Sequence, residues 1–344
     1  MDAPPTHDPI AELITNYNEL NSSFIEELHE EPSALEFMRF VARNTPFVVR
    51  GGAANWQATR EWSVDYLRNF LGDQPVNVAV TPAGNADAPT LYNPPSQPPT
   101  LVLAKPHEHP LPFTALLTHL TSPNPSNSEV HYAQTQNDNL RHEYAPLFTH
   151  HSHNLPTSIP WARLALARDP DAINLWIGNS RSTTALHKDG YENVYVQVAG
   201  RKHFILLPPV CHACVNERML PGARYVRRKR GGDGTAEGEE GGLELVLDGE
   251  GGGDGEGGAV PFPIWDPDKP EENATEYSAL ARPMRVTLEP GDMLYLPCLW
   301  YHKVSQSCSP EEVCIAINYW YDMDYTGPLY PLSTFVRSVS NKNK

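Results

Sequence analysis

The sequence has little cysteine and no long apolar run, and both shortages narrow the classes of protein it can belong to. Its 344 residues include only five cysteines, an odd number that does not make a disulfide framework and that favours a reducing, intracellular environment. No stretch reaches the roughly 18–20 consecutive apolar residues of a membrane-spanning helix, so we expect no membrane partner. The opening segment MDAPPTHDPIAEL shows neither the basic nor the apolar part of a signal peptide. We therefore expect a cytoplasmic or nuclear location, or both.

Positive charge is also scarce. There are 26 Lys and Arg against 42 Asp and Glu, which gives a net charge of −16. Such a surface has no general attraction for nucleic acid. Much of this excess of acidic over basic residues lies in Gly231–Gly258. That segment holds 13 glycines and nine carboxylates but no Lys or Arg. This composition has too little apolar surface to order itself, so we predict a disordered glycine- and acid-rich insertion at about residues 222–260.

Proline, by contrast, is abundant at 34 residues, which disfavours a helical bundle and favours strands and turns. Apolar spacing predicts helices near the N-terminus, over 8–20, 33–44 and 63–71. The segment 85–112 is rich in Pro, Ala and Asn and is expected to be an extended surface loop. From Val130 onward, short apolar runs separated by turn residues predict a β-sandwich or barrel. We therefore divide the chain into an N-terminal helical and strand region, 1–129, packed on a β domain, 130–344.

A possible metal site is suggested by a short motif and one distant histidine. His187 and Asp189 lie two residues apart, and on a strand such residues point to the same face. His302, much later in the chain, supplies a possible third ligand. Two His and one carboxylate with open positions form the facial triad of non-haem Fe(II) oxygenases. Taken alone, the short motif is more often a surface histidine beside a carboxylate.

Lys202 is the second unusual residue. Strand alternation places it on the same face as Phe204 and Leu206, and a lysine on an inward apolar face is costly unless an anion meets it. A dicarboxylate co-substrate would be such an anion. An edge-strand lysine whose ammonium reaches water is an equally good explanation of the local pattern.

Taken together and in order, four segments resemble the Jumonji-C (JmjC) Fe(II)/2-oxoglutarate oxygenases, and more narrowly their small JmjC-only, cupin-like lysyl hydroxylase branch. These segments are 182–193, 200–204, 291–302 and 316–325, and the early segment 45–51 matches the same branch. The resemblance covers most of the chain and fails mainly over the glycine- and acid-rich segment. It implies a mainly β fold with flanking helices, a double-stranded β-helix of the jelly-roll or cupin type.

The same resemblance assigns roles to particular residues. Fe(II) would be bound by His187, Asp189 and His302, with 2-oxoglutarate and O2 as co-substrates. Lys202 would bind the far carboxylate of 2-oxoglutarate, helped by the Tyr132 and Thr184 hydroxyls. Strict alternation puts Thr184 opposite His187, so its role requires a bulge. Three further residues would line the pocket, namely Asn193, Tyr195 and Asn318.

The implied activity is hydroxylation of a side-chain carbon, with lysine as the expected residue, in a protein substrate. Histone demethylation, a peptidase-type activity and a non-catalytic cupin-like binding domain are the alternatives. Small proteins of this family often dimerise through their terminal helices, so a homodimer is also expected.

Two other clusters are weaker candidates. Cys211 and Cys214 form a single C-x-x-C motif, but a structural zinc site needs two more ligands and no second pair has suitable spacing. His150, His151 and His153 lie in a polar stretch without a carboxylate at ligand spacing, which favours surface histidines. The sequence contains no G-x-S-x-G, P-loop or dinucleotide-binding fingerprint.

Overall fold

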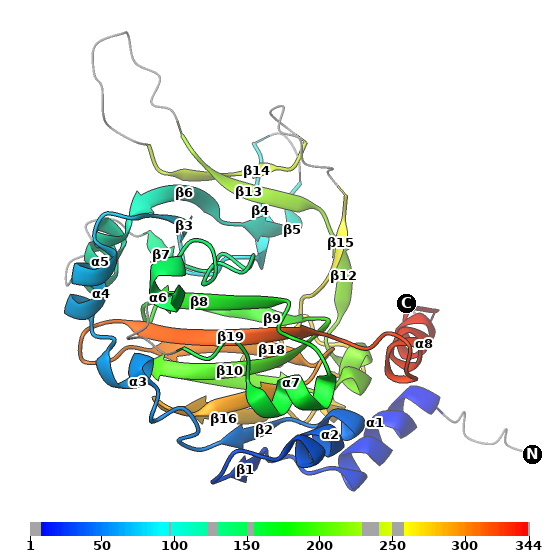
Figure 1. Cartoon of the computed structure of the whole chain (residues 1–344). Helices are drawn as coiled ribbons and strands as arrows, with labels where there is room; N and C mark the ends of the chain where they lie inside the picture. Colours follow the sequence, from blue (N-terminus) through cyan, green and yellow to red (C-terminus); the bar gives the residue numbers. More distant parts are fainter. Residues whose placement is uncertain are drawn as a thin grey trace, which may run out of the picture.

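Two β-sheets form the centre of the molecule (Figure 1). The structure is a computed structural model, and it describes residues 8–95, 98–122, 129–149, 155–228, 241–249 and 258–342. The six-stranded sheet has the order β1 (Glu26–Leu28), β2 (Phe47–Val49), β17 (Met293–Leu296), β10 (Tyr191–Ala199), β19 (Cys314–Asp322) and β8 (Ala172–Gly178). The four-stranded sheet has the order β16 (Met284–Leu288), β11 (Arg201–Leu207), β18 (Tyr301–Ser307) and β9 (Thr184–Lys188).

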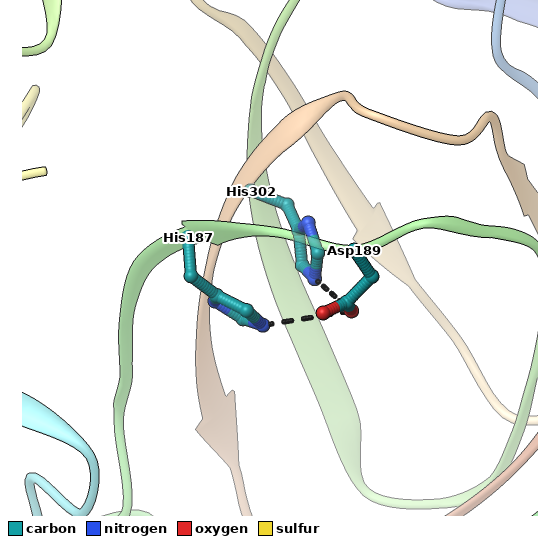
Figure 2. A group of neighbouring side chains, drawn as sticks. All are labelled: His187, Asp189 and His302. Carbon is teal, nitrogen blue, oxygen red and sulfur yellow. Dashed lines mark ion pairs between the residues drawn. The ribbon is translucent and has the colours of Figure 1, made fainter. Parts of the chain in front are cut away.

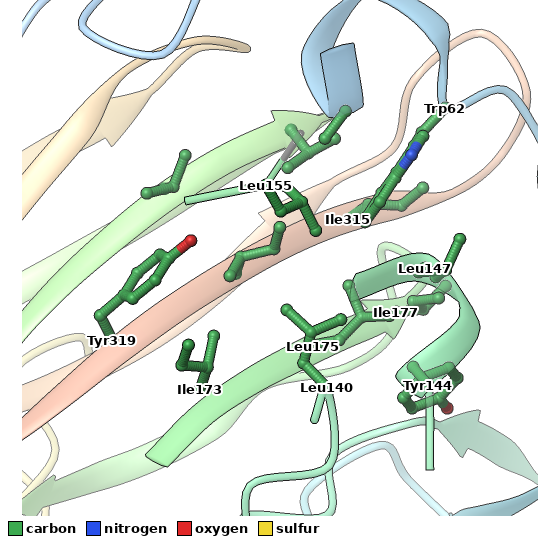
Figure 3. Close-up of a cluster of buried hydrophobic side chains, with 14 of the residues drawn as sticks. Trp62, Leu140, Tyr144, Leu147, Leu155, Ile173, Leu175, Ile177, Ile315 and Tyr319 are labelled. Atoms are coloured by element: carbon green, nitrogen blue, oxygen red, sulfur yellow. The ribbon is translucent and has the colours of Figure 1, made fainter. Parts of the chain in front are cut away.

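Alternation along β10 and β19 gives the six-stranded sheet two different faces. Val194, Val196 and Ile317 point into the main hydrophobic core, part of which is drawn in Figure 3. Asn193 and Asn318 point the other way and line a cavity together with residues of the four-stranded sheet. Two sheets that share one cavity, with helices outside, confirm the predicted mainly β, cupin-like fold.

Helices cover the core-facing side of the six-stranded sheet. The helices of the described chain are α1 (Pro9–Leu20), α2 (Ala34–Arg43), α3 (Gln57–Glu61), α4 (Val64–Leu71), α5 (Phe113–Thr121), α6 (Ala145–Thr149), α7 (Pro160–Leu166) and α8 (Leu329–Lys342), with 3-10 turns at Pro209–Cys214 and Ser278–Leu280. Phe37 of α2, Leu67 of α4 and Leu116 of α5 are fully buried in this core. None of these helices is both long and apolar enough to cross a membrane.

The N-terminal helices begin where their capping residues predict. Asp8 accepts hydrogen bonds from the backbone N–H groups of Ile10 and Ala11, and Pro9 follows at the first helical position of α1. At the start of α2, Ser33 and Glu36 form a reciprocal capping box. The three predicted N-terminal helices are therefore confirmed as α1, α2 and α4.

Three smaller sheets complete the fold. One has the order β6 (His107–Pro112), β3 (Pro75–Thr81) and β7 (Val130–Tyr132). The second has the order β14 (Leu243–Leu247), β13 (Gly222–Arg227), β5 (Thr100–Lys105) and β4 (Ala88–Tyr92). The third pairs β12 (Glu217–Leu220) with β15 (Val260–Pro263).

These strands correct two predictions. The segment 85–112 is not a surface loop, because β4, β5 and β6 pair with β13 and β3, partners that local composition cannot reveal. Its prolines are tolerated in β6 because that strand lies at the edge of its sheet.

The prediction of disorder over about 222–260 is wrong for the part that the structure describes. Strands β13 and β14 lie within it, β15 begins at its last residue, and β14 pairs with β13 along its whole length. Leu243, Leu245 and Leu247 give β14 apolar residues that an average over the glycine-rich segment conceals. The two acids described there are also paired: Asp248 lies 3.2 Å from Arg224, and Glu244 lies 2.8 Å from Arg228. Residues 229–240 and 250–257 lie outside the described residues, and the division at residue 129 stays a prediction.

The turn between β10 and β11 provides a test of the fold, because it sets the register of the strand that carries Lys202. Gly200 has a φ of +66°, and an added Cβ would lie 2.7 Å from the Ser307 carbonyl oxygen. A side chain in left-handed backbone costs roughly 1–2 kcal/mol before any clash. Gly200→Ala should therefore lower the free energy of unfolding by more than about 2 kcal/mol in denaturant titrations. The control is Gly327→Ala, whose Cβ would meet no atom within 4 Å; equal losses in the two variants would contradict this account.

Candidate metal centre

His187, Asp189 and His302 come together as neighbouring side chains (Figure 2), and all three line one cavity. The pairing of β9 with β18 sets His187 directly opposite His302, and Asp189 follows one residue after the end of β9. The Asp189 Oδ2 atom lies 3.7 Å from Nε2 of His187 and 3.6 Å from Nε2 of His302. One potential ligand atom from each side chain lies within 4.8 Å of the others. The structure thus brings together the three residues that the sequence predicted as metal ligands.

The orientation of both imidazoles suits metal binding. Nδ1 of His187 lies 2.8 Å from the Ala185 carbonyl oxygen, and Nδ1 of His302 lies 3.1 Å from that of Trp300. A ring that donates from Nδ1 keeps the Nε2 lone pair available as a ligand. Burial, reinforced by neighbouring His187, lowers the pKa of His302 to about 4, against a smaller opposing effect of Asp189. His302 is therefore neutral at physiological pH, which is the form that binds a metal.

Thr184 reaches the same cavity through a bulge. The register of β9 and β18 shifts between the pairs His302–His187 and Val304–Thr184, so that three steps along β9 match two along β18. The extra residue turns Thr184 to the same side as His187, and both line the cavity. This is the local distortion that the expected position of Thr184 required.

Lys202 lies in the same cavity and is only 2% exposed. Strand β11 is flanked by β16 and β18, so the alternative of an edge-strand lysine that reaches water is wrong. Its Nζ donates to the Tyr132 hydroxyl at 2.9 Å, and within the described residues no carboxylate lies in ion-pairing distance of it. Burial acts to lower the pKa of Lys202, but the Tyr132 and Tyr195 oxygens outweigh it, so the pKa is raised. The cavity therefore contains a buried positive charge that no acidic side chain of the described chain neutralises.

Polar side chains from the six-stranded sheet line the opposite wall. The Asn318 amide donates to Asn193 at 3.3 Å and accepts from the Trp176 indole at 2.9 Å. Tyr195, the third predicted pocket residue, also faces the cavity. Sequence reasoning missed Trp320, whose indole nitrogen is buried without a partner in the described chain. It follows Asn318 by two residues, so strand alternation could have identified it.

A second polar cluster supports the metal ligands from behind. Lys188 and Tyr301, neighbours of the two ligand histidines, pair across β9 and β18, and Lys188 Nζ donates to the Tyr301 hydroxyl at 3.0 Å. Glu217 lies 3.5 Å from Lys188 and 2.8 Å from Arg337 of α8. These contacts hold the two ligand strands together on the face away from the cavity and tie them to the C-terminal helix.

The two weaker sequence candidates receive no support as metal sites. Cys211 and Cys214 are buried free thiols on the 3-10 turn that packs against α1 and α8. Within the described residues, His187, Asp189 and His302 are the one group of three metal-ligating side chains with clustered ligand atoms. His150, His151 and His153 lie outside the described residues.

Comparison with known proteins now decides the family. A family model described as a cupin-like domain matches residues 32–327. The chain belongs to the cupin-like JmjC family. It is 35% identical to a human protein named "Bifunctional peptidase and (3S)-lysyl hydroxylase JMJD7", over 87% of this chain and 84% of that protein.

Two further JmjC relatives match along most of their length. A Dictyostelium discoideum JmjC domain-containing protein E is 33% identical over 97% of this chain and 99% of its own. An Arabidopsis thaliana protein named "Lysine-specific demethylase JMJ32" is 33% identical over 93% of this chain and 87% of its own. Members of the JmjC family use Fe(II) and 2-oxoglutarate.

The role of Asp189 can be tested by metal titration. Loss of an outer partner of a metal ligand lowers affinity by roughly 10–100-fold, and loss of a ligand itself should lower it by more. Asp189→Ala should therefore weaken Mn(II) binding by more than about 100-fold, measured from the EPR signal of free Mn(II). Asp322→Asn, which changes an exposed carboxylate at the end of β19 in the six-stranded sheet, should bind Mn(II) like the wild type. Wild-type affinity in the Asp189 variant would exclude this carboxylate as a ligand.

Proposed function

We propose that this protein is an Fe(II)- and 2-oxoglutarate-dependent oxygenase that hydroxylates a lysine side chain in a protein substrate. One observation carries the proposal: a facial His-Asp-His group and a buried lysine without an acidic partner face the same cavity. The three side chains offer two imidazole nitrogens and one carboxylate, a donor set that suits Fe(II) and leaves positions open. The name of the human relative supports lysine as the residue that is hydroxylated.

The residues of the cavity also fit 2-oxoglutarate. A buried ammonium group is stabilised by an anion that enters the cavity, and the far carboxylate of 2-oxoglutarate would supply one. The hydroxyls of Tyr132 and Thr184 face the same space and can donate to that carboxylate. Iron, 2-oxoglutarate and O2 together supply the oxidising power for inserting oxygen into a C–H bond, with succinate and CO2 as by-products.

The contribution of the chain itself is orientation. His187, Asp189 and His302 would hold the metal on one side, while Lys202 would fix the co-substrate by its distal end. Asn193 and Asn318, already bonded to each other, present a rigid polar wall opposite. The aromatic rings of Trp176 and Trp320 restrict the remaining space and limit access of water. No general acid–base pair is needed for such a reaction.

Mass spectrometry tests the activity directly. The purified protein with Fe(II), 2-oxoglutarate and ascorbate should add single oxygen atoms to lysines in a cell extract, with stoichiometric succinate. The Asp189→Ala protein is the matched control. Release of formaldehyde from methylated lysines would favour the demethylase alternative, which the Arabidopsis relative's name supports. New peptide termini would favour the peptidase, and no turnover at all would favour a binding domain.

A homodimer and a cytoplasmic or nuclear location stay predictions.

Lys202→Met tests the proposed co-substrate contact, because methionine keeps most of the buried aliphatic volume and removes the charge. Charge-assisted hydrogen bonds contribute about 1.5–3 kcal/mol, so the dissociation constant of 2-oxoglutarate should rise at least about tenfold. The measurement is calorimetric titration of the Mn(II)-loaded protein without oxygen. Lys105→Ala removes an exposed lysine that pairs with Asp248 and should leave the constant unchanged. An unaltered constant in the Lys202 variant would place the anion site elsewhere.

A further inference from the structure

The turn between β3 and β4 is fixed rigidly beside the strand that carries His187. The Gly84 carbonyl accepts a 2.8 Å hydrogen bond from the Thr183 backbone N–H, immediately before β9. The Gly84 N–H in turn donates to the Thr81 hydroxyl at 2.9 Å. The chain also passes so close to residue 181 that a Cβ on Gly84 would overlap the Arg181 backbone. Side chains on this turn therefore have a defined position relative to the metal ligands.

Asp87 is the residue of this turn that interacts electrostatically with the ligand His187. Its Oδ2 accepts a 3.2 Å hydrogen bond from the Gln134 side chain. Gln134 is buried and stands in the segment between Tyr132 and Gln136, both of which line the metal cavity. Asp87 also adopts a φ of +50°. Residues other than glycine rarely have such left-handed backbone, and those that do are often found at functional sites.

The charge of Asp87 is poorly compensated. Burial and, to a smaller extent, Glu108 raise the pKa of the Asp87 carboxyl. The Gln134 hydrogen bond, His187 and Lys105 act in the opposite direction, but their effect is smaller, so the pKa stays raised. Within the described residues no cation lies in ion-pairing distance of Asp87. Lys105, the nearby lysine, pairs instead with Asp248 at 3.0 Å. A half-buried carboxylate in such a setting is stabilised by a cation that comes from outside the chain.

A groove beside this turn offers space for the polypeptide that would carry such a cation. It has a volume of about 390 Å³ and lies between Asn85, Ala185 and Trp265. The Asn85 Oδ1 atom is buried without a hydrogen-bond partner in the described chain, so an acceptor is available there for a main-chain N–H. The groove contacts β9 at Ala185 and Leu186, which directly precede His187.

We propose that Asp87 is a specificity-determining residue that binds the cationic end of a basic substrate side chain at the metal site. The proposal rests on the proposed function. It assigns to the Asp87 carboxylate the selection of a cationic substrate side chain over a neutral one. The observations that carry it are the rigid turn, the uncompensated carboxylate beside His187 and the adjoining groove. A lysine ammonium is the cation that the proposed reaction would bring there.

The test uses a binding probe, so that it does not depend on turnover. Nα-acetyl-L-lysine methylamide is added to the Mn(II)- and 2-oxoglutarate-loaded protein without oxygen, and paramagnetic broadening of its side-chain protons is measured by NMR. The norleucine analogue has a similar chain without the charge. We expect the lysine probe, and not the norleucine probe, to be broadened by the wild-type protein. Broadening of the 2-oxoglutarate protons in the same sample reports that the metal site is loaded.

Asp87→Asn is the main variant, because asparagine tolerates left-handed backbone and can still accept from Gln134. It should bind the lysine probe about tenfold more weakly. Asp87→Gly, which also suits the positive φ, should show a similar loss. Glu108→Gln removes the neighbouring exposed carboxylate and should change affinity by less than about twofold.

Several outcomes would overturn the proposal: wild-type affinity in both Asp87 variants, equal broadening of the two probes, or no broadening of either. The proposed function fails separately. Lysine-selective binding that depends on Asp87, in a protein that hydroxylates no lysine in cell extract, would keep the cation site and reject the reaction. Hydroxylation that is unaffected by Asp87→Asn would keep the reaction and reject the cation site.

Discussion

The pairing of β9 with β18 is the constraint on which the site depends. These strands bring His187 opposite His302 although 115 residues separate them in the sequence. One bulge in this ladder turns Thr184 to the same side as the histidines. On the other face, the Lys188–Tyr301 contact and Glu217 resist separation of the two strands. A slip of one residue would move the histidines out of register and send the side chains of the shifted strand to the opposite face.

Charge is distributed unevenly around the metal site. Lys202 is deeply buried and provides positive charge, whereas Asp87 and Asp189 are partly exposed and provide negative charge. The metal ligands lie on the same cavity as the lysine. Such an arrangement favours an anion inside and a cation at the entrance, which matches a dicarboxylate co-substrate and a basic substrate side chain. The co-substrate that reaches the buried Lys202 must therefore enter before the substrate side chain.

Local sequence predicted much of this molecule because local physics decides those parts. The Asp8 and Ser33 caps mark where helices begin, and strand alternation predicted that Lys202 points inward with Phe204. The spacing of His187 and Asp189 identified two ligands at once. Predictions failed over 85–112 and Leu243–Leu247, where short apolar stretches become strands by pairing with distant partners. Composition averaged over a window cannot detect such partners.

The sequence by itself determined which side chains are available: two histidines and a carboxylate for a metal, a lysine for an anion, and the helix caps around them. Only the tertiary structure decided that Lys202 has no acidic neighbour in the described chain, that Thr184 turns toward His187, and that Trp320 carries an unpartnered indole N–H. The reason is physical. Residue type and spacing are local properties, whereas burial, register and the absence of a counter-charge depend on segments that meet only when the chain is folded.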